Sequence, residues 1–462
     1  MIFHCWPFRD DNILRQRILL CARRNVVHYF SHRIKKNITI MSKNKKLLYI
    51  NIDGFSFSYY QRMLAAGKDV FAFAKEGLFF SSLKSGLVSI TNPMQSAILC
   101  GAFSNKTHNF YQHYDFATNS VVRHFRTFDA QNVAQVFRSH GKSVVSVHQF
   151  MLENNPCKEG DKDCLYLTSP VSQSDFSQRF QLLEDIALGN EVHSGGKTFR
   201  YDDFPDFVAL YIDDVDSLGH NNAYKDIPKR REFSLRAQDI DNRLSGIFRR
   251  LERFADIAQS RGFYDDLVIL LTTDHGMTPF FGKSDLDGLV KAINDAGITA
   301  VRADHPYSGE RIVVLPYTIE ASLYSSSPLS EEERQKLFQT LTALPFVERV
   351  VEKSEMLSRY GMDARCAEFI VSPPKGRHFY KKDLPEDTFG ASHDSLDETS
   401  QHIFGCLLSP CLQRATVEEE VSAIDLMPTV LWEFFRYVLP DAEGKILNLR
   451  KYRKDLPSVE VE

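Results

Sequence analysis

An acid and a histidine that could bind a metal ion, Asp274 and His275, directly follow the apolar run 267–271 and its two threonines. A run so apolar and of strand length is typical of a strand buried on both faces of a parallel sheet. Open α/β sheets place their functional groups at the carboxyl ends of such strands. A carboxylate beside an imidazole at that position could bind a divalent ion. The alternative is that Asp274 caps a helix and His275 packs in the core, and this stretch alone does not decide between the two.

Two further strand ends carry residues of the same types. Asp53 follows the apolar run 47–52, and Asp216 and His220 lie just beyond the run 206–213. Because Asp216 and His220 are four positions apart, one helical turn would bring both side chains onto one face. A divalent ion could then bind both of them. The alternatives are a turn acid before a helix at Asp53 and a solvated acidic loop around Asp216.

A hydroxyl group that could act as a nucleophile, Thr91, lies in the stretch SITNPM at 89–94. The Asn-Pro pair marks a turn, and the apolar pattern of residues 94–99 predicts a helix that starts after Thr91. The free amides and the dipole at a helix N-terminus favour an anion, so Thr91 would stand beside a phosphate pocket. A threonine hydroxyl is a weak nucleophile unless a base or a metal ion activates it. The more common role of a threonine at this position is that of an N-cap.

The elements that must position these groups alternate as strand, helix and strand, which is typical of a parallel sheet. A helix is predicted at 58–76, and a long amphipathic helix is predicted at 233–259 before the strand at 267–271. The fold class is therefore α/β, with a mainly parallel central sheet flanked by helices. We predict five segments: a basic extension at 1–45, the two parts of the core at 46–284 and 383–437, an inserted α+β cap subdomain at 285–382, and a frayed polar tail at 438–462.

Charge is distributed unevenly along the chain, whose formal net charge is −4. Residues 1–46 are strongly basic, and the remainder is acidic. A secretory signal needs a continuous apolar segment, and Arg15 and Arg17 interrupt the best candidate. A mitochondrial presequence would fit the arginines and the scarcity of acids better, and a nucleic-acid-binding arm is the other functional interpretation. We favour the interpretation that Met41 is the true start of the protein.

Eight cysteines in 462 residues do not make a disulfide-stabilised scaffold. Cys157 and Cys164 are close in sequence, as are Cys406 and Cys411, but neither pair has the second CxxC-type partner of a structural zinc site. We therefore expect free thiols and a cytoplasmic protein, with organelle targeting by residues 1–40 left open. No apolar run approaches the length of a membrane span, so we expect no contact with a membrane.

Six short motifs in this chain resemble those of the alkaline phosphatase superfamily, and within it the type I phosphodiesterase/nucleotide pyrophosphatase group. Each motif is weak alone, and their occurrence in the family's order makes the resemblance specific. They are IDG at 52–54, VSITNPMQSAILCG at 88–101, DSLGH at 216–220, TTDHGM at 272–277, GASH at 390–393 and AIDLMPT at 423–429. The resemblance implies an alkaline phosphatase-like core, with residues 285–382 as the family's variable cap.

The resemblance also implies a role for each candidate site residue. Two divalent ions about 3.5–4 Å apart would form a clamp for in-line phosphoryl displacement. Zinc is the usual ion, with manganese or iron as alternatives. The substrate would be a small phosphorylated molecule and not a nucleic-acid polymer. One ion would be held by Asp53, Asp274, His275 and the nucleophile Thr91, the other by Asp216, His220 and His393, and Asn92 would contact a phosphate oxygen.

Two departures from the family pattern leave alternatives open. Thr91-Asn92-Pro93-Met94 replaces the Thr-Phe-Pro-Asn of nucleotide pyrophosphatases, and the Thr-Asn pair is closer to phosphonoacetate hydrolase. Asp394 stands where a glycine normally follows the last metal-binding histidine. The predicted function is hydrolysis of phosphate diesters or nucleotide pyrophosphates through a phosphothreonine. The alternatives are C–P bond hydrolysis in the same site and a metal-binding relative without turnover. The organic group of the substrate and the oligomeric state do not follow from the sequence.

Overall fold

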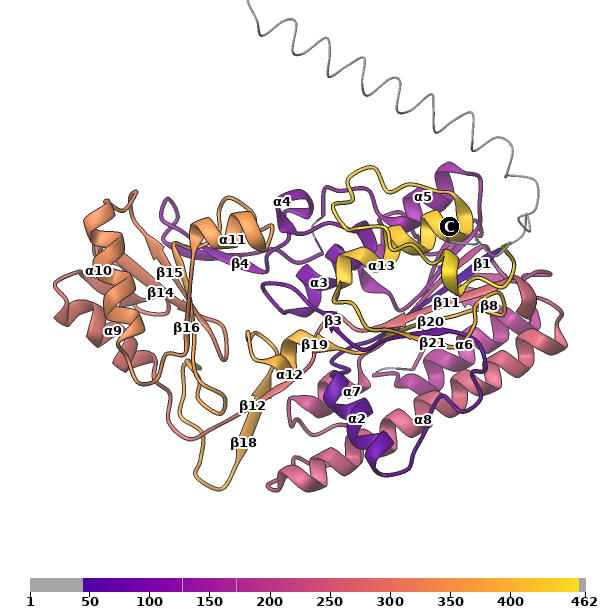
Figure 1. The fold of residues 1–462 in the computed structure, drawn as a ribbon, viewed down its shortest axis with the longest axis horizontal. Helices are drawn as coiled ribbons and strands as arrows, with labels where there is room; N and C mark the ends of the chain where they lie inside the picture. Colours follow the sequence, from indigo (N-terminus) through magenta and orange to yellow (C-terminus); the bar gives the residue numbers. More distant parts are fainter. Residues whose placement is uncertain (1–44, 127, 172, 457–462) are drawn as a thin grey trace, which may run out of the picture. The chain divides into compact units, whose positions relative to one another are not determined.

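The computed structural model describes residues 45–126, 128–171 and 173–456, and its centre is an eight-stranded sheet (Figure 1). The predicted basic extension lies outside the described residues, except for Lys45. Along the sheet the strands are β21 (Ala415–Val417), β2 (Leu78–Phe80), β20 (Gly405–Leu408), β11 (Leu267–Thr272), β1 (Lys46–Ile52), β10 (Phe207–Ile212), β6 (Val144–Val147) and β7 (Cys164–Leu167). β11, β1, β10, β6 and β7 run parallel to one another, whereas β20 is antiparallel to both β11 and β2. The predicted mainly parallel α/β sheet is thus confirmed.

Helices cover both faces of the sheet because its central strands alternate their side chains between two apolar layers. In β1, Leu48 and Ile50 enter one core cluster, while Leu47 and Tyr49 enter the other. The first layer contains α2 (Phe57–Ala65), α6 (Phe176–Leu188), α7 (Asp214–Gly219) and α8 (Phe233–Ser260), and the second contains α3 (Thr91–Cys100), α5 (Val133–Ser139) and α13 (Ala423–Val430) (Figure 1). The long helix predicted at 233–259 is α8, whose apolar stripe is buried in the first layer.

The helix predicted at 58–76 is shorter in the structure and ends at Ala65. Gly67 follows with a φ of +72°, a left-handed conformation that stops a helix. The chain then turns so that Phe71 is buried beside Phe248 and Phe404. The apolar residues that suggested a longer helix therefore fill the core as an irregular segment.

Residues 286–372 contain a second sheet of five strands, which is drawn in orange tones in Figure 1. Its order is β13 (Ala300–Arg302), β14 (Ile312–Pro316), β15 (Ala321–Ser325), β17 (Phe369–Ser372) and β16 (Arg349–Glu352). One face packs on α9 (Leu286–Asp295) and α10 (Glu331–Thr342), while residues of the hairpin β4 (Gln112–Asp115) and β5 (Ser120–Arg123) and of α11 (Lys353–Arg359) pack on the other. We call residues 286–372, which lie within the predicted segment 285–382, the cap.

A two-stranded ribbon and several short elements connect the cap to the core. The ribbon pairs β12 (Thr278–Phe281) with β18 (Phe389–Ser392) in antiparallel fashion, so both connections to the cap lie side by side. The remaining elements are α4 (Ser104–Thr107), α12 (Glu398–Gln401), the sheet of β19 (His402–Ile403), β3 (Leu83–Lys84) and β22 (Val421–Ser422), and the hairpin of β8 (Val192–Ser194) and β9 (Lys197–Phe199).

The tail beyond residue 438 was predicted to fray, and for its described part this prediction is wrong. Leu439 and Leu449 are buried in the second apolar layer. The amides of Glu443 and Gly444 both donate to the carbonyl of Gly101, at 2.8 and 3.0 Å. Two leucines and these backbone bonds are enough to hold a segment whose composition is otherwise polar. Among the described residues, none of the helices combines the length and the apolar character that crossing a membrane requires.

Candidate functional site

Three adjacent strands of the central sheet end beside the candidate site. β1 lies between β11 and β10 and pairs in parallel with both, with Asn51 opposite Thr272 and Ile52 opposite Ile212. Parallel strands end at one edge of the sheet, so the residues that follow them are brought together. Asp53 follows β1, and Asp274 and His275 follow β11 after a single threonine.

Asp53, Asp274 and His275 form the first cluster of potential ligands. One atom from each lies within 4.8 Å of the others, and all three side chains are buried. Nε2 of His275 is 3.2 Å from Oδ1 of Asp53 and 3.7 Å from Oδ2 of Asp274. The hydroxyl of Thr91 reaches the same point, with Oγ1 3.1 Å from Nε2 of His275. These are the four groups that the family resemblance assigned to one ion.

Asp216, His220 and His393 form the second cluster, and His275 also borders it, because one atom each of Asp216, His275 and His393 lies within 4.8 Å of the others. Nε2 of His220 is 3.3 Å from Oδ1 of Asp216, and Nε2 of His393 is 3.8 Å from the same oxygen. Asp216 lies in α7, which starts after β10, and His220 is the C-cap of that helix. The predicted helical turn thus brings Asp216 and His220 together. His393 lies directly after β18.

The three histidines all direct Nε2 to the clusters and use Nδ1 elsewhere. Nδ1 lies 2.8 Å from the Ala391 carbonyl in His220, 3.0 Å from the Gly276 carbonyl in His275, and 2.8 Å from the Ser89 carbonyl in His393. A carbonyl only accepts hydrogen bonds, so each Nδ1 must carry the proton. When such an imidazole is neutral, it presents the lone pair of Nε2 to its cluster, which is the arrangement of metal-binding histidines.

Two carboxylate oxygens test whether these residues fit metal ions. Oδ1 of Asp53 and Oδ1 of Asp216 are buried, and neither has a hydrogen-bond partner. A buried charged oxygen without a partner is costly unless a cation lies beside it. One unpartnered oxygen belongs to each cluster, and the mixed oxygen and nitrogen donors suit zinc, manganese or iron. The donor set therefore fits two divalent ions.

The electrostatics of the clusters indicate the same need for positive charge. Burial raises the pKa of Asp53 well above its usual value, and the charges of Asp274 and Asp216 raise it further. Burial opposes the protonation of His220, yet the carboxylate of Asp216 raises its pKa to about 9. Burial lowers the pKa of His393, and the neighbouring His275 adds to that effect. Three acids crowded in a dry site bind protons or cations to offset their repulsion.

Thr91 is not the N-cap of its helix. The N-cap of α3 is Ile90, whose side chain makes no capping bond, and Thr91 is the first helical residue. Its hydroxyl is therefore free of the common capping role and points to the first cluster instead. Asn92 follows in the same turn and is partly exposed, and its carbonyl is 3.4 Å from Nδ2 of Asn109.

Two residues that contact the clusters were missed by the sequence interpretation. The phenol of Tyr211 donates a hydrogen bond to Oδ2 of Asp53. Nε2 of Gln95 donates to Oδ2 of Asp274 at 3.0 Å. The only signals in the sequence are weak: Tyr211 interrupts an apolar strand, and Gln95 is a polar residue four positions after Thr91 in a helix that is otherwise largely apolar. Neither pattern shows that Tyr211 contacts Asp53 or that Gln95 contacts Asp274.

Asp394, the unusual acid beside His393, binds the cap. Its Oδ2 accepts hydrogen bonds from the backbone amides of Thr318, Ile319 and Glu320 at 2.7, 2.7 and 3.2 Å. These amides belong to the turn between β14 and β15. Asp394 therefore connects the segment that carries His393 to the cap.

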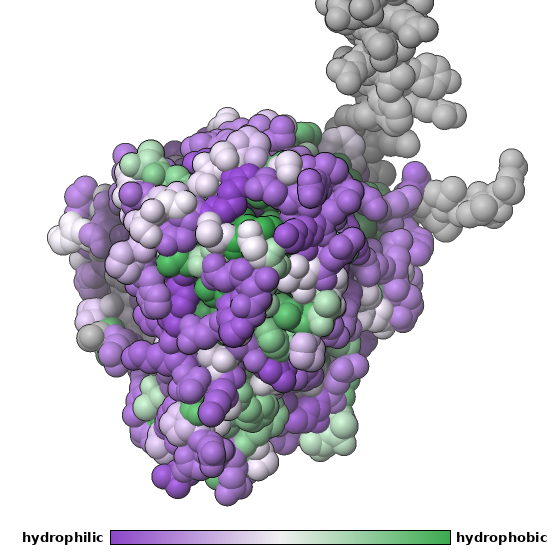
Figure 2. All heavy atoms as spheres, turned by 90° about the vertical axis from the view of Figure 1, so that its left-hand side faces the viewer, coloured by the Kyte–Doolittle hydropathy of each residue, from purple (hydrophilic) through white to green (hydrophobic). Residues whose placement is uncertain are grey.

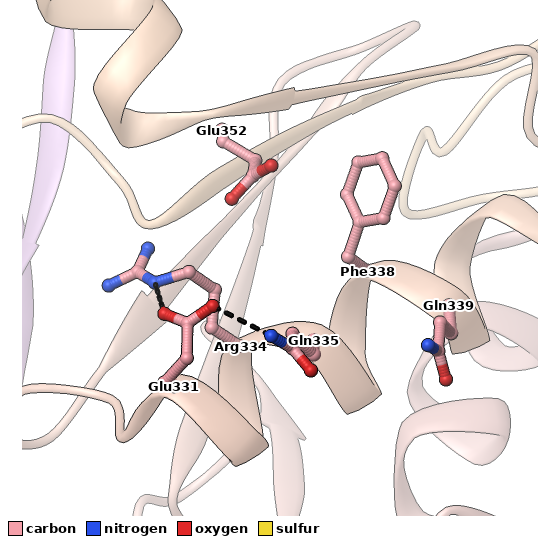
Figure 3. Close-up of a pocket in the computed structure, with 6 residues that line it drawn as sticks. All are labelled: Glu331, Arg334, Gln335, Phe338, Gln339 and Glu352. Atoms are coloured by element: carbon pink, nitrogen blue, oxygen red, sulfur yellow. Dashed lines mark hydrogen bonds and ion pairs between the residues drawn. The ribbon is translucent and has the colours of Figure 1, made fainter.

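Among the residues that the structure describes, the groups of potential metal ligands lie at the two clusters and not on the cap helices. Figure 2 shows the side of the protein that presents the cap helices as mostly hydrophilic, with small separate apolar areas. A pocket of about 130 Å³ lies on the cap, and its lining residues come from α10 and β16 (Figure 3). They include Glu331, Arg334 and Phe338, and none of the cluster residues is among them. We assign this pocket no role in the chemistry.

Comparisons with known proteins agree with the fold and with the motifs. The structure of murine ectonucleotide pyrophosphatase/phosphodiesterase 5 superposes with a TM-score of 0.60 at 16% identity, covering 87% of this chain and 98% of that chain. The human protein of the same name has a TM-score of 0.62 at 16% identity, covering 88% and 100%. An inactive threonine-to-alanine variant of the murine protein, in complex with AMP, has a TM-score of 0.61 at 16% identity, again covering 88% and 100%. At 16% identity, these structural matches show a similarity of fold only.

Family membership follows from the sequence. No protein among the curated sequences matches this chain. The family model of type I phosphodiesterase/nucleotide pyrophosphatase matches residues 47–396, which include the candidate ligands and Thr91. That match covers most of the chain, from the first strand of the core through the cap to the residues after His393. The chain therefore belongs to the type I phosphodiesterase/nucleotide pyrophosphatase family of the alkaline phosphatase superfamily.

Proposed function

We propose that this protein hydrolyses phosphate diesters or nucleotide pyrophosphates at a two-metal centre, with Thr91 as the nucleophile. The observation that carries the proposal is the position of the Thr91 hydroxyl. Oγ1 lies at the first residue of α3 and 3.1 Å from Nε2 of His275, within the cluster that contains Asp53 and Asp274. A hydroxyl that does not cap its helix and that lies against His275 is available for chemistry at this point.

We propose that each cluster binds one divalent ion, and that the ion is zinc, with manganese or iron as alternatives. Two bound ions would lower the pKa of the Thr91 hydroxyl and of water, and would offset the charge of the phosphate. The protein residues keep the ligand atoms in place: the backbone carbonyls orient the three imidazoles, and Tyr211 and Gln95 orient Asp53 and Asp274.

The reaction proceeds in two displacements on phosphorus. Thr91 loses its proton to solvent, and Oγ1 forms a bond to phosphorus as the bond to the leaving oxygen breaks. The amides at the start of α3 and the side chain of Asn92 would contact the phosphate oxygens. Water then attacks the phosphothreonine, the bond between phosphorus and Oγ1 breaks, and Thr91 regains a proton. The leaving group departs on the side of Asp216, His220 and His393.

The nucleotide part of the proposal is supported by the murine structural neighbour. That protein was captured with AMP in a variant inactivated by replacing a threonine with alanine. Its likeness to this chain is one of fold, so the assignment of Thr91 depends on the contacts of Thr91 itself.

The experiment uses metal-stripped protein that is reloaded with zinc or manganese. Hydrolysis of bis-p-nitrophenyl phosphate, p-nitrophenyl phosphate and phosphonoacetate is then compared, with Thr91→Ala as the inactive control. A metal-dependent preference for the diester supports the proposal, and nucleotides are tested next. Turnover of phosphonoacetate alone would assign the protein to C–P bond hydrolysis. The absence of turnover on all three and on nucleotide diesters and pyrophosphates would contradict the proposal.

A further inference from the structure

A chain of buried side-chain amides leads from residues 149–151 to Asp274. Nε2 of Gln95 donates to Oδ2 of Asp274 at 3.0 Å, and Nε2 of Gln149 donates to Oε1 of Gln95 at 2.9 Å. Oε1 of Gln149 accepts from the backbone amide of Met151 at 3.3 Å. Gln95, Gln149 and Asp274 are all completely buried. We call this chain the amide relay.

The direction of every hydrogen bond in the amide relay follows from chemistry. The carboxylate of Asp274 only accepts, so Gln95 must present its NH₂ group to it. The carbonyl oxygen of Gln95 is then left to accept from the NH₂ group of Gln149. The backbone amide of Met151 only donates, which requires the carbonyl oxygen of Gln149 to face it. The two glutamine amides are therefore locked in one orientation, and neither can turn over without breaking two bonds.

The oxygen that receives this hydrogen bond is the one that faces the first cluster. Oδ2 of Asp274 is 3.7 Å from Nε2 of His275. The other oxygen, Oδ1, accepts from the amide of His275, the hydroxyl of Thr273 and the amide of Gly54, at 3.0, 3.1 and 3.4 Å. The carboxylate is thus held from both sides, and Gln95 is the only side-chain amide among its hydrogen-bond donors in the described structure.

The amide relay also couples Asp274 to the nucleophile. Gln95 is four residues after Thr91 in α3, so both side chains lie on one face of the helix. Thr91 contacts Nε2 of His275, while Gln95 contacts the carboxylate of Asp274, the residue just before His275. One short helix therefore holds the reactive hydroxyl and orients a ligand of the same cluster.

We propose that Gln95, held by Gln149, is a positioning residue that fixes the Asp274 carboxylate for the ion of the first cluster and sets its distance from Thr91. This inference rests on the proposed two-metal function. Hydrogen-bond partners of metal ligands usually contribute 10- to 100-fold to metal affinity. Loss of the amide relay should therefore weaken one ion only, because no member of the relay contacts Asp216, His220 or His393 in the hydrogen bonds and ion pairs of the described structure.

The test measures the binding of both ions to full-length protein without relying on turnover. Gln95→Met, Gln149→Met and the double variant are stripped of metal and titrated with zinc against a chelating dye. Gln135→Met is the matched control, because Gln135 donates a hydrogen bond to Asn155 at 3.0 Å on the same side of the sheet but does not approach Asp274. Thermal unfolding of each metal-free variant reports stability separately.

The expected result is that Gln95→Met binds one ion about 10- to 100-fold more weakly than wild type, while the second ion is unchanged. The double variant should show the same loss of the first ion as Gln95→Met, and it also leaves the backbone amide of Met151 without its acceptor, as Gln149→Met does. Gln149→Met should show a smaller loss of the same ion, and it replaces Gln95→Met if that variant does not fold. The control should bind both ions as wild type does.

The outcomes separate this inference from the proposed function. If Gln95→Met and Gln149→Met bind both ions with wild-type affinity, the amide relay has no positioning role, whatever the turnover of the wild type. An equal loss of both ions together with a large loss of metal-free stability would also overturn it, since that is the signature of a structural role. If the wild type itself binds no divalent ion, the proposed function fails and the inference fails with it.

Discussion

The imidazole rings of His275 and His393 stack, with their centroids 3.6 Å apart and their planes inclined by 13°. The two residues follow strands of different sheets: β11 belongs to the central sheet, and β18 to the ribbon that leads to the cap. His275 belongs to the first cluster and also lies close to Asp216 and His393, so the stacked pair connects the two clusters. The position of the second cluster relative to the first therefore depends on how the ribbon packs against the core.

Replacing the hydroxyl of Thr91 should separate chemistry from metal binding. In Thr91→Ala the nucleophile is absent, while Asp53, Asp274 and His275 remain. We expect turnover of a diester to fall by about 10³-fold or more, because loss of a nucleophile removes an entire covalent step. Metal analysis should give a content near that of wild type. Activity within a few-fold of wild type would rule out Thr91 as the nucleophile.

Occupation of the clusters should stabilise the fold. A ligand that binds only the folded state at 100 times its dissociation constant adds about 2.7 kcal/mol to the free energy of unfolding. We expect chelator-treated protein to unfold at a lower temperature and to recover when zinc is added. In Asp216→Ala the second cluster loses its only carboxylate, so calorimetric titration should detect one ion instead of two. An unchanged stoichiometry in this variant would contradict the assignment of Asp216.

Asp394 should matter for substrate binding through the cap. Asp394→Asn replaces the anion that three backbone amides of the β14–β15 turn contact. We expect a loss of about 1–3 kcal/mol in the free energy of unfolding, and a larger change in KM than in kcat, because the cap shifts while the ligands stay. Asp115→Asn, in the exposed part of the β4–β5 hairpin, is the control. A fall in kcat at unchanged KM would mean that Asp394 acts on the chemistry instead.

Glu320 should make stability depend on pH. Burial raises the pKa of Glu320 from its usual value of 4.5 to about 8, and the charge of the nearby Asp394 adds to the increase. Between these values the folded state binds a proton that the unfolded state has released, so stability is fully present below about pH 4.5 and is lost as pH rises towards 8. Glu320→Gln keeps the acceptor for the amide of Leu396 and carries no charge. Its melting temperature should fall less than that of wild type between pH 5 and pH 8 in the same buffers.

The sequence alone was enough to predict the central sheet and to locate most of the candidate ligands. Apolar runs of strand length, with Asp53, Asp274 and His275 directly after them, are local signals, and parallel strands necessarily bring their carboxyl ends to one edge. The spacing of Asp216 and His220 is local as well. His393 follows no strand of the central sheet, and only its motif suggested that it belongs with the others.

Only the tertiary structure decided the contacts that orient these ligands. The carbonyls that hold His220 and His393 come from residues 171 and 304 positions away, and the donor to Oδ2 of Asp274 comes from 179 positions away. Such pairs depend on how layers pack, and hydrophobic periodicity carries no information about them. The early end of α2 and the packed tail have the same origin, because burial of Phe71 and Leu449 outweighed the local pattern. Local patterns therefore determined which residues lie near the site, and packing determined the geometry in which they meet.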